Sequence, residues 1–504
     1  MQKFLSHQKL IYNPELRFRK EEHRCIAYTI DDFFYSPDKV SVLLPQEVIT
    51  LLLFDGEHTF LEVAKNVSYV FGLSHEEVES LPLDKLETML YNSLELIEKR
   101  TNIVPLVVDA ETVKPHLLKE TQNRYPNPGY FVISKENIIF NPRDLRLSSP
   151  LSVNYNVMTS CGFKCKYCYH PLVNVKDLIS LDRLKTIFTE LKESGCESFM
   201  LTGGDPMLRA DIDEMMKALH DVGLYYSLST KSVLTDERIK KLRNEAGLTG
   251  MQISLDSSNS ETVKYLLGIN DDEYLTKLLH MIDTMQQNDI DVRVKAVLTS
   301  YNVQGLDEYL DLLYDKGIRR MQVVQYGRSG TRHTDDLFPT EDQLKIASDI
   351  VENFKQLHTD VQLTAGGFAP SYDEPVIADP ITNENIFAKR AICNAGRFSM
   401  TMMPNGEVFV CEQLPYDKRY VLGDLRSMSV NECWNGELMT TWLSPPSRDS
   451  FAENSPCRSC KDEHFTECHK VYSRCLRFIY EHTGDTSTCD IKCPHYKFEA
   501  RRIT

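Results

Sequence analysis

The stretch from Leu151 to Gln325 alternates short apolar runs with helical patterns, and this alternation restricts the possible folds more than any other feature. Six runs have the length and composition of strands: Leu151–Met158, Ser198–Leu201, Tyr225–Ser229, Met251–Leu255, Val292–Leu298 and Met321–Gln325. Helical patterns fill the gaps: Leu181–Ser194, Asp211–Val222, Asp236–Asn244, Asp272–Asn288 and Leu306–Lys316. Strands that alternate with helices form parallel sheets. We therefore expect an α/β fold, a partial (β/α)6 barrel, with functional groups at the carboxyl ends of its strands.

Segments of different character flank this barrel. Residues 1–105 contain short apolar runs followed by three helical patterns, an order that predicts a winged-helix-like N-terminal domain. Residues 106–150 carry five prolines and no long period, so we expect a linker or a connecting strand pair there. The barrel is expected over 151–335, a connector over 336–392 and a cysteine-rich C-terminal domain over 393–504.

The 14 cysteines are concentrated in two places. Three lie at 161–168, and nine lie between residues 393 and 493. In a reducing cytoplasm such groups indicate metal binding rather than disulfide bonds. The C-terminal domain has little regular core, so metal centres are needed to hold it. Three isolated cysteines are expected to be buried apolar thiols: Cys25, Cys196 and Cys433.

The first cysteine group follows directly on the first strand, with three residues between Cys161 and Cys165 and two between Cys165 and Cys168. Three thiolates on one loop can ligate three irons of a four-iron cube and leave the fourth iron open to a chelating ligand. Two alternatives stay open. Cys165 and Cys168 alone would be half of a zinc site. A haem attachment motif would need His after Cys168, where Tyr169 stands.

With Tyr167 before the third cysteine, this spacing resembles the radical S-adenosylmethionine superfamily. The resemblance implies a catalytic 4Fe–4S cluster on Cys161, Cys165 and Cys168, whose open iron binds the amino and carboxyl groups of S-adenosylmethionine. It also implies reductive cleavage of this cofactor to a 5′-deoxyadenosyl radical that abstracts hydrogen from the substrate. An electron donor such as flavodoxin or ferredoxin would be a partner. Tyr167 would be one of the cofactor-binding residues.

A second element matches the family after the second strand. Gly203, Gly204, Asp205 and Pro206 are similar to its Gly-Gly-Glu-Pro element, with Asp205 in place of the commoner Glu. The resemblance implies that all four bind the cofactor. Glycines let a backbone approach closely, here to the methionine amino group. An ordinary turn is the alternative for these four residues taken alone.

The ends of the next two strands carry further polar residues. Ser229 ends the third strand, and Ser254 and Asp256 end the fourth. The resemblance implies contacts from these residues to the carboxylate and ribose of the cofactor. Ser and Asp are also common helix caps, so that alternative stays open. Arg293 and Arg328 are weaker candidates for the cofactor carboxylate.

The C-terminal cysteines resemble the SPASM extension of peptide-modifying radical enzymes. Twelve residues separate Cys393 from Gly406, and four more separate Gly406 from Cys411. The resemblance implies two auxiliary 4Fe–4S clusters, and so three clusters in the chain. It assigns Cys393, Cys411 and Cys475 to the first auxiliary cluster. It assigns four cysteines to the second: Cys457, Cys460, Cys468 and Cys493.

This match departs from the family in one region. The gaps before Cys468 and Cys475 are seven and six residues, longer than in the family, which puts the roles of both in doubt. Cys489 is an extra candidate. Either Cys489 supplies a fourth ligand to the first auxiliary cluster, or that cluster has an open iron. One or two structural zinc sites are the rival interpretation.

The N-terminal 105 residues resemble the RiPP recognition element, a winged-helix domain of peptide-modifying systems. The resemblance rests on Leu51–Gly56, Thr59–Ala64 and an apolar helix ending at Ile97. Such domains bind the leader of a ribosomally synthesised precursor peptide as an added strand on a sheet edge. A generic helical cap and a DNA-binding winged helix are the alternatives. No dense basic stripe supports the latter.

Charge and hydropathy exclude other classes of partner. The net charge of −16 does not attract nucleic acid or an anionic membrane. No stretch approaches the roughly 18 consecutive apolar residues of a transmembrane helix. The first ten residues lack a signal-peptide core, so we expect a cytoplasmic protein.

Together these resemblances predict an enzyme that matures ribosomally made peptides by a radical mechanism. The cross-link expected first is a thioether from a cysteine of the precursor, and a carbon–carbon link is the runner-up. A sulfatase-maturing enzyme shares the auxiliary clusters but has no reason to carry a leader-binding domain. The alternative without catalysis is a zinc-stapled peptide-binding protein.

Overall fold

The computed structural model describes residues 4–31, 36–101, 103, 105–141, 144–170, 175, 177–327, 332, 334–366, 393–466, 468–469, 474–490 and 493. These residues fall into two compact units, one ending at Ser148 and the other beginning at Ser149. Each unit packs around a hydrophobic core of its own.

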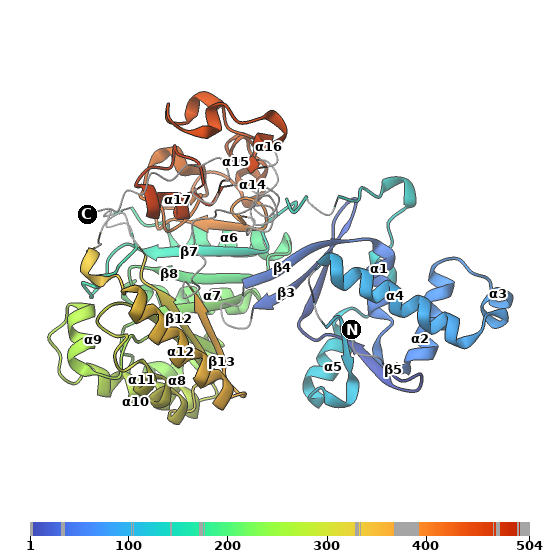
Figure 1. The fold of residues 1–504 in the computed structure, drawn as a ribbon, viewed down its shortest axis with the longest axis horizontal. Coiled ribbons are helices and arrows are strands. Elements are labelled where there is room, and N and C mark those ends of the chain that lie inside the picture. The colour runs from blue at the N-terminus through green and yellow to red at the C-terminus, as the bar shows by residue number, and fades with distance from the viewer. Residues whose placement is uncertain are drawn as a thin grey trace. The chain divides into compact units, whose positions relative to one another are not determined.

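The second unit is built on a ten-stranded sheet (Figure 1). All six predicted strands are present, each parallel to the next: β7 (Ser152–Met158), β8 (Ser198–Gly203), β9 (Tyr225–Thr230), β10 (Gly250–Ser254), β11 (Asp291–Leu298) and β12 (Arg320–Gln325). The five predicted helices are also present: α6 (Leu181–Glu193), α7 (Ile212–Asp221), α8 (Asp236–Glu245), α10 (Tyr274–Gln287) and α11 (Leu306–Asp315). The predicted α/β barrel sheet is thereby confirmed.

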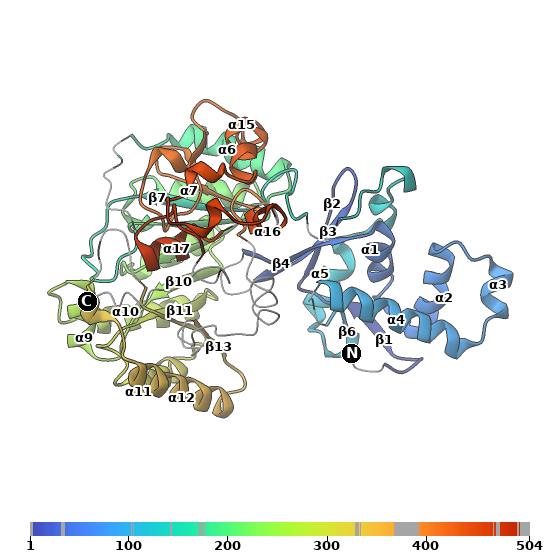
Figure 2. The ribbon, with the colours of Figure 1, turned by 45° about the horizontal axis from the view of Figure 1, so that its top comes forward.

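This unit also contains elements that were not predicted. Strand β13 (Gln362–Gly366) follows helix α12 (Glu341–Leu357) and pairs in parallel with β12, inside the expected connector. Figures 1 and 2 both show α12 side by side with α11. At the opposite edge, β14 (Ser399–Met402) pairs in parallel with β7. Helix α9 (Ser260–Leu267) lies in the chain between β10 and α10.

The two faces of the barrel sheet differ in polarity because successive side chains of a strand point to opposite faces. One face is apolar and fully buried, as at Val153, Tyr155 and Val157 of β7. The other face is polar on neighbouring strands, and the register aligns its side chains in rows. Polar residues of this inner face include Asn156, Ser229, Gln252, Lys295 and Gln322. A polar inner face suits a polar ligand rather than a packed core.

The C-terminal part continues the same sheet. Strands β15 (Glu407–Phe409) and β16 (Val421–Asp424) extend it in antiparallel fashion from β14. Four short helices follow: α14 (Val430–Asn435), α15 (Glu437–Leu443), α16 (Asp462–Thr466) and α17 (Leu476–Thr483). A Cβ at Gly423 of β16 would lie 2.7 Å from the sulfur of Cys433. Burial is confirmed for all three isolated cysteines, Cys25, Cys196 and Cys433.

The first unit contains two three-stranded sheets. In one, β3 (Cys25–Asp31) lies between β2 (Leu16–Lys20) and β4 (Ser36–Leu43), and both pairings are antiparallel. In the other, β1 (Lys9–Tyr12) lies between β5 (Asp55–Thr59) and β6 (Val107–Asp109). The three predicted helices are α1 (Pro45–Leu52), α2 (Phe60–Val70) and α4 (Leu83–Thr101), and α3 (His75–Ser80) is additional.

The expected linker over residues 106–150 is wrong, because its described residues up to Ser148 belong to the first unit. Within it, β6 pairs with β1, and helix α5 (Pro115–Arg124) follows. Phe131 is 1% exposed in the core of this unit. Turn-forming prolines gave the stretch the appearance of a linker, although several of its apolar residues, such as Leu106, Val107 and Phe131, are buried.

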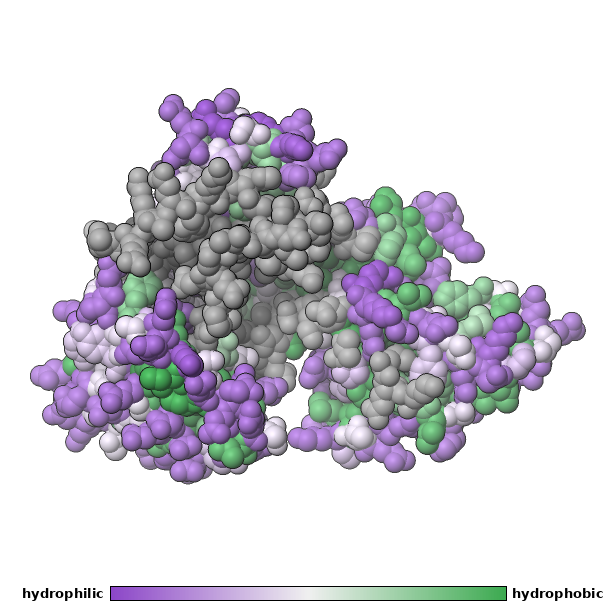
Figure 3. Space-filling view, viewed as in Figure 1, coloured by the Kyte–Doolittle hydropathy of each residue, from purple (hydrophilic) through white to green (hydrophobic). Residues whose placement is uncertain are grey.

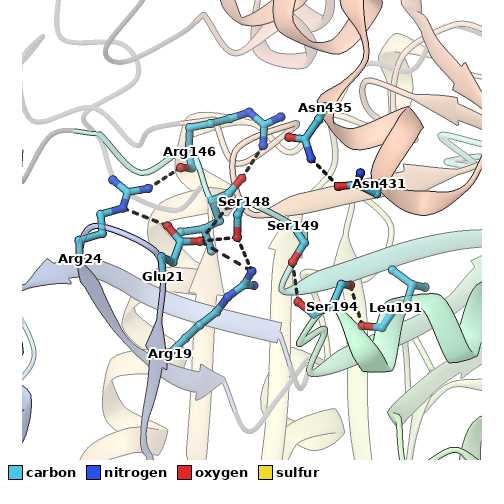
Figure 4. A network of polar contacts seen from close by, with 11 residues as sticks. Arg19, Glu21, Arg24, Arg146, Ser148, Ser149, Leu191, Ser194, Asn431 and Asn435 are labelled. Atoms are coloured by element: carbon cyan, nitrogen blue, oxygen red, sulfur yellow. Dashed lines mark hydrogen bonds and ion pairs between the residues drawn. The ribbon is translucent and has the colours of Figure 1, made fainter. Parts of the chain in front are cut away.

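The end of this stretch is fixed by the carboxylate of Glu21 (Figure 4). This carboxylate accepts hydrogen bonds from the amide and hydroxyl of Ser148, at 2.9 and 3.0 Å, and from Arg24 Nε at 3.0 Å. Arg24 also donates to the carbonyls of Asp144 and Arg146. The first unit therefore holds the chain firmly up to the residue before the second unit begins.

Both units present a mainly hydrophilic face with scattered hydrophobic residues in the view of Figure 3. Within the described ranges, no helix combines the length and apolar character needed to cross a membrane.

Candidate active site and metal centres

The three barrel cysteines lie on the loop that leaves the carboxyl end of β7. Cys165 is buried, Cys168 is half-buried and Cys161 is exposed. Burial raises the pKa of Cys165 to about 12, and the charges of Cys161 and Cys168 add to this rise. The three thiols are therefore close electrostatic neighbours. A cationic iron cluster would stabilise their thiolate forms, which burial alone disfavours.

Helix α9, absent from the predicted elements, braces this loop. The amides of Lys164 and Lys166 donate to the carbonyls of Leu267 and Leu266, both at 2.9 Å. The helix ends at Gly268, which has φ +64° and whose Cβ would lie 2.9 Å from the carbonyl of Lys164. The cysteine loop is thus tied by its backbone to the end of a packed helix.

Gly203 and Gly204 hold the start of the cysteine loop against β8. A Cβ at Gly204 would lie 2.0 Å from the carbonyl oxygen of Ser160, and Gly203 has φ +124°. The amide of Gly204 donates to Met158 at 2.8 Å, and that of Asp205 donates to Ser160 at 3.1 Å. The sequence suggested close approach to a cofactor. The structure also shows close approach between two segments of the protein itself.

The carboxylate of Asp205 joins the ends of two neighbouring strands. It accepts hydrogen bonds from the Thr230 hydroxyl at 2.8 and 2.9 Å and from the amide and hydroxyl of Ser232 at 3.1 and 3.0 Å. Asp205 is 2% exposed. In this arrangement its side chain fixes the turn after β9. A contact of its backbone with the cofactor stays a prediction, as does any role of Pro206.

Tyr167 and Asp256 form a buried pair beneath the cysteine loop. The Tyr167 hydroxyl donates to one carboxylate oxygen of Asp256, and the other oxygen accepts from the amide of Val297 at 2.9 Å. Burial, with the charge of Asp256, raises the pKa of Tyr167 far above its ordinary value. The ammonium of Lys231 lies 5.5 Å from the centroid of the Tyr167 ring. Burial alone would lower the pKa of Lys231, but the negative charges of Cys165 and Asp256 have the larger combined effect and raise it.

The other predicted cofactor residues lie on the inner face of the sheet. Ser229 accepts a hydrogen bond from Gln252 Nε2 at 2.7 Å, and Ser254 pairs in register with Lys295. Arg293 is 1% exposed and forms an ion pair with Asp291 at 3.2 Å, toward the amino end of β11. This position does not favour Arg293 as a ligand at the carboxyl ends. Arg328 lies outside the described residues.

The predicted first auxiliary set is brought together. The charge of Cys475 acts on Cys393, and the charges of Cys393 and Cys475 both act on Cys411. Burial raises the pKa of Cys411 to about 12. Cys489, the extra candidate for this set, is a neighbour of Cys457 and Cys493 instead.

Residues beside these cysteines reach the inner face of the barrel, which the sequence did not indicate. Glu412 follows Cys411, and its charge interacts with Lys295 of β11 and with Arg477 of α17. The same glutamate raises the pKa of Tyr169, which follows Cys168. One buried oxygen of Glu412 has no hydrogen-bond partner within the described part of the chain. Tyr169 and Glu412 are far apart in the sequence, so only the folded structure shows that they lie near each other.

The described cysteine side chains do not form a single-ion site in this structure. Among the described residues, which include all 14 cysteines, no three side chains of His, Cys, Asp or Glu converge closely enough to hold one metal ion. A tetrahedral zinc site needs four ligands around one centre. A cubane binds each thiolate at a different iron, so its ligands stay further apart. The zinc interpretation gains no support from this arrangement.

Two parts of the chain match known protein families. Residues 155–314 match the Radical SAM superfamily, and residues 393–461 match SPASM, an iron–sulfur cluster-binding domain. These ranges contain the barrel cysteine loop and the first cysteines of the C-terminal set.

Similar proteins are known across most of the chain. The PqqA peptide cyclase of Bradyrhizobium diazoefficiens is 27% identical over 68% of this chain and 86% of its own length. That of Methylocella silvestris is 24% identical over 69% and 88%. Two crystal structures of Streptococcus suis SuiB, one with S-adenosylmethionine and one with the precursor peptide SuiA, each have a TM-score of 0.57 at 16% identity. Each covers 96% of this chain and 100% of SuiB, and this likeness extends the shared fold through both units.

Proposed function

Because the chain is a radical S-adenosylmethionine enzyme with a SPASM domain, we propose that it cross-links a ribosomally synthesised precursor peptide. The cross-link that we propose is a thioether between a cysteine sulfur and a carbon of the same peptide. The observation that supports a peptide substrate is the sheet β2–β3–β4 of the first unit, whose edge strand β4 is the candidate site for a leader.

That edge is β4, because the other edge of its sheet is closed. On β2, the Tyr125 hydroxyl accepts from the amide of Phe18 at 2.6 Å and donates to its carbonyl at 3.1 Å. The backbone N–H and C=O of Phe18 therefore point away from β3. Those of its partner Ala27 point away from β2, toward β4. The register Ala27↔Ser41 then directs the backbone N–H and C=O of Val42 away from β3, the side on which an added strand would pair, although the residue as a whole is 1% exposed.

The relatives support this proposal by what they act on and bind. The curated relatives are peptide cyclases, and SuiB has been crystallised with a precursor peptide. Helix α4, which carries the exposed apolar residues Met89 and Leu96, is joined to β4 by a bond from Ser41 Oγ to the Thr101 carbonyl at 3.2 Å. Exposed apolar side chains on a helix that contacts β4 suit a peptide that adds a strand and inserts side chains.

In the second unit the residues have separable tasks. Cys161, Cys165 and Cys168 would hold the catalytic cluster. When bound, S-adenosylmethionine and the clusters supply the hydrogen-abstracting radical and an acceptor for the electron released. The paired glycines keep the cysteine loop against β8, and the polar inner face gives hydrogen-bond partners to a peptide segment. A flavodoxin or ferredoxin in the reducing cytoplasm would supply electrons, and we place the protein in that compartment.

The thioether fits the first auxiliary set. Three thiolates on Cys393, Cys411 and Cys475 leave one iron of a cubane without a protein thiolate. A cysteine of the precursor is a suitable ligand there. A carbon–carbon link is the second candidate, since the word cyclase in the relatives' name covers either bond.

The leader site is tested with Val42→Pro. Proline removes the outward amide of Val42 while keeping an apolar side chain, and edge strands tolerate it. We expect affinity for the precursor encoded beside the gene to fall about tenfold, measured by fluorescence anisotropy. Lys20→Pro, on the closed β2 edge, is the matched control and should bind like the wild type. Equal binding by Val42→Pro and the wild type would contradict recognition at β4.

The bond is tested on the reaction product. Either cross-link lowers the peptide mass by one hydrogen molecule. A thioether also blocks one cysteine from alkylation by iodoacetamide, whereas a carbon–carbon link leaves every cysteine reactive. Mass spectrometry after alkylation therefore separates the two bonds. An unchanged precursor mass after turnover would reject the peptide-maturase proposal itself.

A further inference from the structure

The second auxiliary centre has more cysteines around it than a cubane can use. Five lie in this region, whereas a four-iron cluster takes four thiolates: Cys457, Cys460, Cys468, Cys489 and Cys493. We propose that the ligands of this chain are Cys457, Cys460, Cys489 and Cys493, with Cys489 in the place that the family pattern gives to Cys468. The inference rests on the second auxiliary cluster of the proposed function, but not on the peptide substrate.

Packing selects these four residues. Cys457 and Cys489 form one buried cluster with Phe451 and Phe465, and Cys460 and Cys493 pack against it. Cys489 is 1% exposed, so its thiol faces the interior of this group. A hydrogen bond joins the Cys489 and Cys493 thiols. Two apolar rings and four sulfur side chains thus enclose one small volume.

Backbone contacts bring the two ligand segments together. The amide of Ala452 donates to the carbonyl of Ser487 at 3.1 Å, which joins the chain before Cys457 to the chain before Cys489. The amide of Cys493 donates to Asp490 at 2.9 Å, closing a turn that brings Cys493 back toward Cys489. Cys457 and Cys460, with two residues between them, are therefore brought near Cys489 and Cys493, which lie on one turn.

Cys468 is a neighbour of this group but does not pack within it. Its charge acts on Cys457 and on Arg474. It is not among the cysteines that pack with Phe451 and Phe465. Its sequence position also departs from the family, since seven residues separate it from Cys460. Position in the fold therefore favours Cys489 over Cys468.

Arg474 gives the centre a compensating charge. Its guanidinium lies 4.5 Å from the centroid of the Phe451 ring and donates to the carbonyl of Thr486 at 3.2 Å. The charges of Cys457, Cys468, Asp490 and Cys489 all act on it. A cation held among thiols favours their ionised, metal-binding form. This contact ties the segment before Cys489 to the same centre.

The test compares Cys489→Ala with Cys468→Ala in the full-length protein, reconstituted anaerobically with iron and sulfide. By cubane stoichiometry the parent should hold about twelve irons in three clusters. We expect Cys489→Ala to lose between one and four irons, about one cluster at most, and Cys468→Ala to keep the parental content. Mössbauer spectra should show the loss in a single cluster. Circular dichroism of both variants checks that the rest of the chain stays folded.

Every other pattern overturns the assignment. Loss of iron only from Cys468→Ala would restore the family pattern, and loss from both or from neither would show that the four chosen ligands are wrong. A parent with about eight irons would remove the second auxiliary cluster, and this assignment with it. A parent with about twelve irons that leaves its precursor unmodified would reject the proposed function alone.

A second measurement uses the unmodified enzyme and so does not depend on a variant folding. Native, cluster-loaded protein is treated with iodoacetamide under argon, and its cysteines are mapped by mass spectrometry. Metal-bound thiolates resist alkylation. We expect Cys468 to be alkylated without loss of iron, and Cys460 and Cys493, which are equally half-buried, to be protected until a chelator removes the clusters. Protection of Cys468 alongside Cys460 would contradict the proposal.

Discussion

At the residue scale, Gly204 has the tightest contact of the candidate active site. Gly204→Ala would place a methyl group 2.0 Å from the Ser160 carbonyl, so the cysteine loop must move. Overpacking of this kind costs about 1–3 kcal/mol. We expect S-adenosylmethionine cleavage to fall at least about tenfold, measured as 5′-deoxyadenosine. Gly162→Ala in the same loop meets nothing within 4 Å and should retain cleavage. Equal loss in both variants would contradict the contact.

Candidate site residues could be predicted from the sequence where the alternation of strands and helices was enough to locate them. The three cysteines, the glycine pair and Asp256 all follow strand ends, which periodicity located well. The task of Asp205 could not be foreseen, because it depends on contacts with Thr230, at the end of the next strand, and with Ser232, in the turn after it. The position of Glu412 was even harder to predict, because its partner Lys295 lies on β11, in another part of the fold.

Lys295 predicts a pH dependence of stability. Burial lowers its pKa from 10.5 in the unfolded chain to about 8 in the fold. Between these values the unfolded chain binds the extra proton, so stability rises with pH. Relative to Lys295→Met, the wild type should gain about 2–3 kcal/mol from pH 8 to 10. Thermal unfolding under anaerobic conditions measures this difference. Parallel pH profiles of the two proteins would show that Lys295 keeps its ordinary pKa.

At the element scale, helix α9 should affect the cluster as well as the stability. Leu266→Ala removes a fully buried side chain and costs about 2–5 kcal/mol. Its carbonyl also holds the Lys166 amide, so we expect faster loss of iron from the catalytic cluster to a chelator. Leu313→Ala of α11 is equally buried and serves as the control. It should lower the melting temperature similarly without changing iron release. If Leu266→Ala and Leu313→Ala released iron at the same rate, α9 would have no specific effect on the cysteine loop.

The elements that the sequence missed are short or weakly patterned. Strand β13 has one buried side chain, Leu363, among exposed neighbours, so no apolar run marks it. Helix α9 has only eight residues, so it depends on its contacts with the cysteine loop and the core for stability. The long amphipathic helices and the buried parallel strands were predictable because tertiary packing and local pattern agree there.

At the scale of the whole molecule, the boundary at Ser148 can be tested by truncation. Deleting residues 1–148 removes a complete core, so the remaining chain should load its clusters and cleave S-adenosylmethionine without modifying the precursor. Deleting only residues 1–105 removes most of the core that buries Leu106, Val107 and Phe131 and leaves these apolar residues exposed. We therefore expect this shorter deletion to aggregate. Size-exclusion chromatography compares the two truncated proteins. If the shorter deletion behaved as well, the first unit would end earlier than the structure indicates.

Strand β14 gives the barrel an order of assembly. The ribosome makes β7 and its cysteine loop early, but the strand that covers the outer edge of β7 belongs to the C-terminal domain. Until Ser399–Met402 has emerged, the nascent barrel exposes an unpaired edge on β7, the strand that leads into the cysteine loop. The edge closes only when the chain is nearly complete. We therefore expect cluster insertion to follow the closing of this edge, with an open sheet edge and three cysteines in need of protection until then.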